Sequence, residues 1–123
     1  MKHIILGREN VIQTKSFDFA LNIVRLVKKL QNEQKEYVLS KQVLRSGTAI
    51  GAMIREAEHA ESKKDFTHKM SISLKEANET RYWLDLLYKS DFMEAGNYQM
   101  LNDEITQILR ILASIVKSSK LKS

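Results

Sequence analysis

The sequence contains no proline, no cysteine, only four glycines and seven per cent aromatic residues. β-Hairpins and β-sandwiches need turns rich in proline and glycine, so their scarcity argues against an all-β fold. The lack of cysteine excludes disulfides, thiolate metal sites and cysteine nucleophiles, and it fits a reducing compartment. No stretch approaches the roughly eighteen consecutive apolar residues of a membrane-spanning helix. We therefore expect a helical protein that is not embedded in a membrane.

The residues that are present are typical of a folded cytoplasmic domain. Hydrophobic residues make up 43% of the chain and charged residues 28%, which is ordinary for a globular protein. The apolar start at residues 1–6 is too short for a secretory signal, so we expect a cytoplasmic localisation. A chain of 123 residues can bury one compact core, and we expect a single domain spanning residues 1–123.

Four segments carry apolar residues at alternating spacings of three and four, the period of an α-helix packed on one side. They span residues 16–30, 37–60, 63–89 and 95–117, with an irregular lead at 1–14 and an irregular tail at 118–123. The short connections between these segments make neighbouring helices antiparallel. The sequence thus predicts an all-α fold, an up-down-up-down antiparallel four-helix bundle.

Local signals mark the ends of some helices. Ser16 is a good N-cap with Asp18 in the first turn, which predicts that the first helix begins there. Residues 31–34 are expected to connect the first two helices. Residues 62–65 resemble a capping box in which Asp65 replaces the usual glutamate, so we expect the third helix to begin after Ser62.

The second helix carries two glycines, Gly47 and Gly51, four residues apart on one face. Glycine weakens a helix, so this spacing predicts a close crossing with a neighbouring helix. A phosphate-binding glycine loop is the less favoured interpretation, because no strand precedes the glycines and the lysine of that motif is missing. The core-facing residues of this helix are predicted to be Leu39, Val43, Ser46, Ile50, Met53, Ala57 and Ala60.

Two pairs of residues have the spacing of metal ligands on one helical face: Glu56 with His59, and Asp65 with His68. The apolar faces of the same helices point the other way, so we expect both histidines to face solvent. No serine, histidine or carboxylate spacing suggests a catalytic triad or an acid/base pair. We therefore expect no metal, no cofactor and no enzymatic activity.

The first and third helices have more apolar residues than one bundle core requires. The surplus residues are Phe17, Val24, Ile72, Trp83 and Leu86. An exposed apolar area of this size on a monomer is unusual, so these residues are candidates for an oligomer interface.

Twenty basic against fifteen acidic residues give a formal charge of +5, which favours polyanionic partners. In the third helix Lys75 and Lys89 share an outward line with His68 and Tyr82. No aromatic platform is evident, so contact with backbone phosphates is the expected mode of binding. Candidate nucleic-acid-binding residues are Arg45, Arg55, Lys63, Lys64, Lys75, Lys89, Lys117 and Lys120.

Expected salt bridges join Glu56, Glu76 or Glu79 to Arg55, Lys75 or Arg81.

Several ordered blocks of the sequence carry a family resemblance. They are residues 15–20 (KSFDFA), 39–52 (LSKQVLRSGTAIGA), 55–57 (REA), 60–66 (AESKKDF) and 71–84 (SISLKEANETRYWL). These blocks resemble the bacterial four-helix bundle family called 23S rRNA intervening-sequence proteins, and the fourth helix agrees in pattern only. Ala49 stands where the family has a serine, and Met53 where it has an asparagine, so any polar contact of that asparagine is lost here.

The resemblance implies a four-helix bundle that assembles as a ring, often a pentamer, and it does not imply an enzyme. A similar bundle occurs in the accessory variability protein of diversity-generating retroelements, which works with a reverse transcriptase and binds nucleic acid. The leading hypothesis is therefore a homo-oligomeric accessory protein that binds RNA or DNA. An oligomeric scaffold with a protein partner is the alternative, and an undetected enzyme or metal protein is the third.

Overall fold

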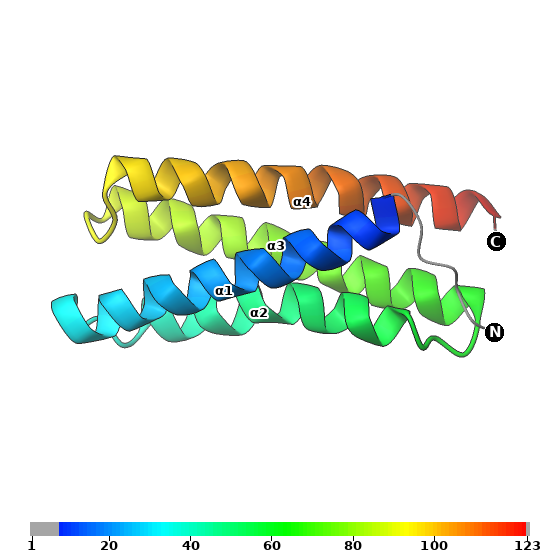
Figure 1. Ribbon diagram of the computed structural model, residues 1–123, viewed down its shortest axis with the longest axis horizontal. Helices are drawn as coiled ribbons and strands as arrows, with labels where there is room; N and C mark the ends of the chain where they lie inside the picture. The colour runs from blue at the N-terminus through cyan, green and yellow to red at the C-terminus, as the bar shows by residue number, and fades with distance from the viewer. Residues whose placement is uncertain (1–7, 123) are drawn as a thin grey trace.

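The computed structural model describes residues 8–122, which form four helices joined by short turns (Figure 1). The helices are α1 (Arg8–Gln34), α2 (Leu39–Ala57), α3 (Lys63–Lys89) and α4 (Ala95–Lys122). Consecutive helices run antiparallel, and residues 8–122 contain no strand. α1 and α3 each pack against both α2 and α4 but not against each other, so they occupy diagonal corners. The all-α up-down-up-down bundle predicted from the sequence is confirmed.

The first helix is longer than predicted. It includes residues 8–14, which were expected to be irregular, while residues 1–7 lie outside the described part of the chain. Ser16 is not an N-cap: it is buried inside the helix, and its hydroxyl donates to the carbonyl of Gln13 at 3.1 Å. The apolar face continues through the fully buried Ile12, which lies one turn before Ser16. In the sequence, this buried serine has the same signature as an N-cap residue, and for that reason the predicted helix began too late.

The other boundaries also differ at their ends. α1 continues through residues 31–34, and the connection to α2 lies at 35–38, where Lys35 has a φ of 56°. α2 begins at Leu39 instead of 37 and ends at Ala57 instead of 60. α4 continues through the predicted tail to Lys122, because Ser119 is buried against Thr67 of α3.

The third helix has the bounds predicted from its capping signal. The Ser62 hydroxyl accepts a hydrogen bond from the backbone N–H of Asp65 at 3.0 Å. The Asp65 carboxylate in turn accepts the N–H of Glu61 at 3.2 Å, one residue earlier than in a standard capping box. These two bonds fix where α3 begins and, with it, the position of the lysines that follow Ser62.

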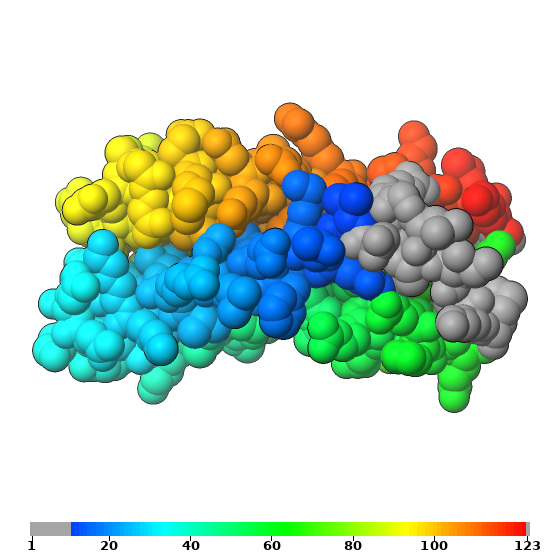
Figure 2. Space-filling model, in the orientation of Figure 1, coloured from blue at the N-terminus to red at the C-terminus, as the bar shows by residue number. Residues whose placement is uncertain are grey.

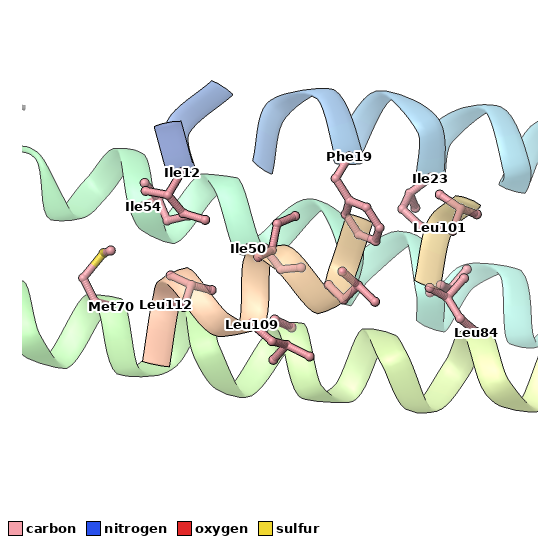
Figure 3. Close-up of a cluster of buried hydrophobic side chains, with 14 of the residues drawn as sticks. Ile12, Phe19, Ile23, Ile50, Ile54, Met70, Leu84, Leu101, Leu109 and Leu112 are labelled. Atoms are coloured by element: carbon pink, nitrogen blue, oxygen red, sulfur yellow. The ribbon is translucent and has the colours of Figure 1, made fainter. Parts of the chain in front are cut away.

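The core lies along the bundle axis and draws on all four helices (Figure 3). Ile12, Phe19 and Ile23 of α1 point toward the other three helices. They meet side chains that include Ile50 and Ile54 of α2, Met70 and Leu84 of α3, and Leu101, Leu109 and Leu112 of α4.

Two predicted core positions in α2, Met53 and Leu39, are only half-buried. Ile54 is buried, whereas Met53 is half-buried, because the inward face of α2 rotates toward Ile54 in its last turns. Leu39 is also only half-buried, and Ser40 takes the buried position at the start of the helix.

The predicted close helix crossing at the two glycines is confirmed. A Cβ atom on Gly47 would lie 3.0 Å from both Cγ atoms of Ile23, and one on Gly51 would lie 3.3 Å from the hydroxyl of Ser16. Both neighbours belong to α1, so the glycines face α1. Their lack of a side chain lets α1 and α2 approach each other.

On its other side α2 is joined to α3 by buried hydroxyl groups. The Ser73 hydroxyl donates to the carbonyl of Ile50 at 2.9 Å, and the Thr80 hydroxyl donates to the Ser46 oxygen at 2.8 Å. Within the described residues no buried side-chain nitrogen or oxygen is left without a hydrogen-bond partner. The polar residues of the core are therefore compatible with its stability, because burial is costly only for unpaired groups.

Candidate nucleic-acid interface

Antiparallel packing brings five of the predicted basic residues to one end of the bundle. Lys63 and Lys64 open α3, and Lys117 and Lys120 lie in the last turns of α4. The contact between the hydroxyls of Thr67 and Ser119 places these two helix ends side by side (Figure 1). Arg55, in the last turn of α2, lies at the same end. We call this group, Arg55, Lys63, Lys64, Lys117 and Lys120, the basic end.

The other three predicted basic residues lie elsewhere. Arg45 and Lys75 lie within α2 and α3, and Lys89 lies at the opposite end of the bundle. Arg45 forms salt bridges with Glu76, at 3.2 Å, and with Glu79 of α3. The hydrogen bond from the Trp83 indole, together with the Arg45 guanidinium, lowers the pKa of Glu79 below its ordinary value. Arg45 is thus already neutralised by carboxylates and is a poor phosphate ligand.

The predicted salt bridges connect different partners from those expected. Glu56 pairs with Lys69 at 3.1 Å, not with Arg55, and Glu76 and Glu79 pair with Arg45, not with Lys75 or Arg81. Salt bridges along one helix or between helices were both expected, and the observed pairs all link α2 to α3. Their basic partners, Arg45 and Lys69, are set by the packing of these two helices and were not among those expected.

Several of the predicted lysines differ from Arg45 in having no internal partner. The side chains of Lys63, Lys64 and Lys117 are exposed and form no ion pair or hydrogen bond with any described residue. The same holds for Lys75 and Lys89 on α3. Exposed and unpaired lysines can contact phosphate without first losing an internal partner.

A groove of about 520 Å³ lies between α1 and α2 beside the basic end. Its floor includes Ala20 and Gly51, and the Arg55 guanidinium lies 5.9 Å from the centre of the Phe17 ring on its rim. Gln13 donates to Glu58 across the groove. Small residues at the helix crossing account for this groove, and no motif in the sequence indicated it.

The two histidines considered as metal ligands are exposed, as predicted, His59 in the turn after α2 and His68 on α3. Among the side chains that the structure describes, those of residues 11–122, no group of three or more histidine, aspartate or glutamate residues is placed to hold a metal ion. No helix in the same part of the chain is long and apolar enough to cross a membrane.

The predicted interface residues divide into two sets. Phe17 and Val24 on α1 are 53% and 37% exposed, and the structure adds Leu21 between them at 40%. Figure 2 shows α1, in blue to cyan, along the middle of one face of the molecule. We call Phe17, Leu21 and Val24 the α1 face.

The second set of predicted interface residues lies on α3. Ile72, Trp83 and Leu86 are half-buried, on the side of α3 that carries Glu76 and Glu79 toward α2. Their partial burial accounts for part of the apolar surplus that the sequence assigned to an interface.

A family model described as 23S rRNA-intervening sequence protein matches residues 8–114. The chain belongs to this family. The resemblance carried by the sequence blocks is therefore confirmed, and the match extends into α4, where the sequence agreed in pattern only.

A solved structure supports the fold of this 23S rRNA-intervening sequence protein. It is the crystal structure of a protein with unknown function from the S23 ribosomal protein family of Bacteroides thetaiotaomicron, with 53% identity and a TM-score of 0.88. The similarity covers 90% of this chain and 99% of that one. No curated protein matches the chain.

Proposed function

We propose that this family member is a non-enzymatic, homo-oligomeric accessory protein that binds RNA or DNA through its basic end. The observation that carries the proposal is the pairing of the α3 start with the α4 end, which gathers lysines distant in sequence on one surface. Three of them, Lys63, Lys64 and Lys117, have no internal partner among the described residues. Phosphate contacts by such lysines release counterions, which gives binding without sequence preference.

Oligomerisation strengthens this binding. The α1 face exposes three neighbouring apolar side chains that a monomer would leave in water, and contact with a second copy would bury them. The family resemblance favours a ring of five protomers. Five copies with a formal charge of +5 each carry about +25 on one particle, so weak contacts act together. The assembly would then hold a polyanion that a single chain binds poorly.

A salt titration tests the proposal. Labelled RNA is titrated with the protein at low and moderate salt, and fluorescence anisotropy should report an affinity that falls steeply as salt rises. Changing Lys63 and Lys64 to Glu should weaken binding more than tenfold. The control variant changes Lys29 and Lys41, two exposed lysines far from the basic end, and alters the net charge equally. No binding by the wild-type protein at low salt would reject the proposal and leave the scaffold with a protein partner as the better account.

A further inference from the structure

A line of basic and aromatic side chains runs along the outer surface of α3. Its members are His68, Lys75, Tyr82 and Lys89, each seven residues from the next and each exposed. Seven residues correspond to about 10.5 Å along a helix, and the small angular drift keeps all four on one face. α3 packs only against α2 and α4, so this face is turned away from the bundle. We call these four residues the α3 track.

Tyr82 is the centre of the track and is 59% exposed, an unusual state for a large aromatic side chain. Its ring meets Trp83 edge-on, with the two ring centres 5.0 Å apart and the planes at 72°. The Trp83 indole N–H donates to Glu79 at 2.9 Å, and Glu79 is paired with Arg45. This chain of contacts supports the ring from one side and leaves much of it open to solvent.

The acidic groups near the track already have partners. Glu76 and Glu79 pair with Arg45, and Asp85 accepts a hydrogen bond from the hydroxyl of Tyr98 at 2.5 Å. Lys75 and Lys89 have no such partner among the described residues. The track therefore offers two free positive charges, about 21 Å apart, with an exposed aromatic ring midway between them.

We propose that the α3 track binds single-stranded nucleic acid, with Tyr82 stacking on a base and Lys75 and Lys89 contacting phosphates on either side. This inference rests on the proposed function and adds a base contact to the phosphate contacts of the basic end. A ring flanked by cations is the arrangement by which proteins hold single strands without reading their sequence. In a duplex the base faces are covered, so Tyr82 has a stacking partner only in a single strand. A span of about 21 Å accommodates several nucleotides.

The α3 track stays accessible if copies associate through the α1 face. α1 and α3 occupy diagonal corners of the bundle, so a contact on the outer side of α1 does not itself cover the outer side of α3. In a ring each copy uses a second surface as well, and the inference requires that surface to lie away from the α3 track. The track also begins near Lys63 and Lys64, since these open the same helix. A strand could therefore run from the basic end along α3.

Binding of three labelled probes of equal length tests the inference: single-stranded oligo-U, single-stranded oligo-T and a duplex. Tyr82→Ala should weaken binding of both single strands about tenfold and leave duplex binding unchanged, because only the stacking contact is lost. Tyr82→Phe keeps the ring and should retain wild-type affinity. The matched control is Tyr37→Ala, which removes another exposed tyrosine, at 48%, in the turn between α1 and α2. Tighter binding of oligo-U or oligo-T would assign RNA or DNA as the preferred strand.

Trp83 provides a second measurement, because it is the only tryptophan and touches Tyr82. Single strands should change its fluorescence in the wild type, and Tyr82→Ala should abolish that change. If wild-type protein binds single strands but Tyr82→Ala binds them equally well, the proposed binding at the α3 track is wrong. The proposed binding at the basic end then remains. If wild-type protein binds no probe at low salt, the proposed function itself fails, and the track fails with it.

Discussion

Glu36 determines where α2 begins, although the sequence has no recognisable capping motif at that position. Its carboxylate accepts the backbone N–H groups of Val38, Leu39 and Ser40, at 3.2, 3.0 and 2.7 Å. The Ser40 hydroxyl donates back to the Glu36 carbonyl at 2.8 Å. Partial burial by itself would raise the pKa of Glu36, but the three N–H groups outweigh it and lower the pKa below its ordinary value. Three of the unpaired N–H groups that open a helix are thus satisfied by one side chain.

Replacing Glu36 by alanine should lower the free energy of unfolding by about 1–2 kcal/mol at pH 7, the usual cost of a lost cap. Because the folded-state pKa is lowered, the contribution of the carboxylate is present above its unfolded pKa. It is lost as the pH falls through the folded pKa. Urea unfolding should therefore show a smaller difference between wild type and variant at pH 3 than at pH 7. Glu33→Ala, at an exposed position on α1, serves as the control and should change stability by less than about 0.5 kcal/mol.

At the scale of the helices, the sequence predicted helix ends correctly where neighbouring residues in the sequence form the cap. α3 was predicted correctly at both ends, because residues 62–65 form a side-chain cap that the sequence displays. α1 was predicted to begin too late, because Ser16 looks like a cap in sequence but is a buried serine beneath Gly51. Whether a serine caps a helix or sits inside one depends on the neighbouring helix, which one segment of sequence does not show.

The close approach of α1 and α2 leads to a prediction about their glycines. Gly47→Ala should cost about 1–3 kcal/mol, because the new methyl group would lie 3.0 Å from Ile23 in a packed core. Gly96→Ala, near the start of α4, meets no atom within 4 Å and should be neutral or stabilising by about 0.5 kcal/mol. Thermal unfolding of the two variants beside wild type measures both effects. Equal stabilities of the two variants would show that α1 can move away from α2 at little cost.

At the scale of the whole molecule, the candidate site could be predicted only in part. The outward line of Lys75, Tyr82 and Lys89 follows from helical spacing alone. The grouping of Lys63 with Lys117 depends on how α3 and α4 align, and the pairing of Arg45 depends on the α2–α3 contact. Sequence spacing places residues on one helix, whereas a surface shared by two helices requires their packing.

The α1 face predicts that the protein associates with copies of itself, and the proposed ring of five gives the expected mass. Light scattering of wild-type protein should give about 71 kDa, which is five chains of 14.2 kDa. Leu21→Glu places a charge in the middle of the α1 face and should shift the mass toward that of one chain, since a buried unpaired charge is costly. Val38→Glu adds the same charge at a more exposed apolar residue, 72% exposed in the turn before α2, and should leave the assembly intact. A wild-type mass near 14.2 kDa at micromolar concentration would contradict this prediction.

The hydroxyl groups buried between α2 and α3 have a consequence for the outside of the protein. Apolar side chains tolerate sliding of one helix along another, but the bonds from Ser73 to Ile50 and from Thr80 to Ser46 form at one longitudinal alignment only. A shift of one turn, about 5.4 Å, would break both bonds and leave their polar atoms unpaired in the core. The same shift would carry Lys63 and Lys64, at the start of α3, away from Arg55 in the last turn of α2. Uncharged groups in the interior thus set the charge pattern that a polyanion would meet at the surface.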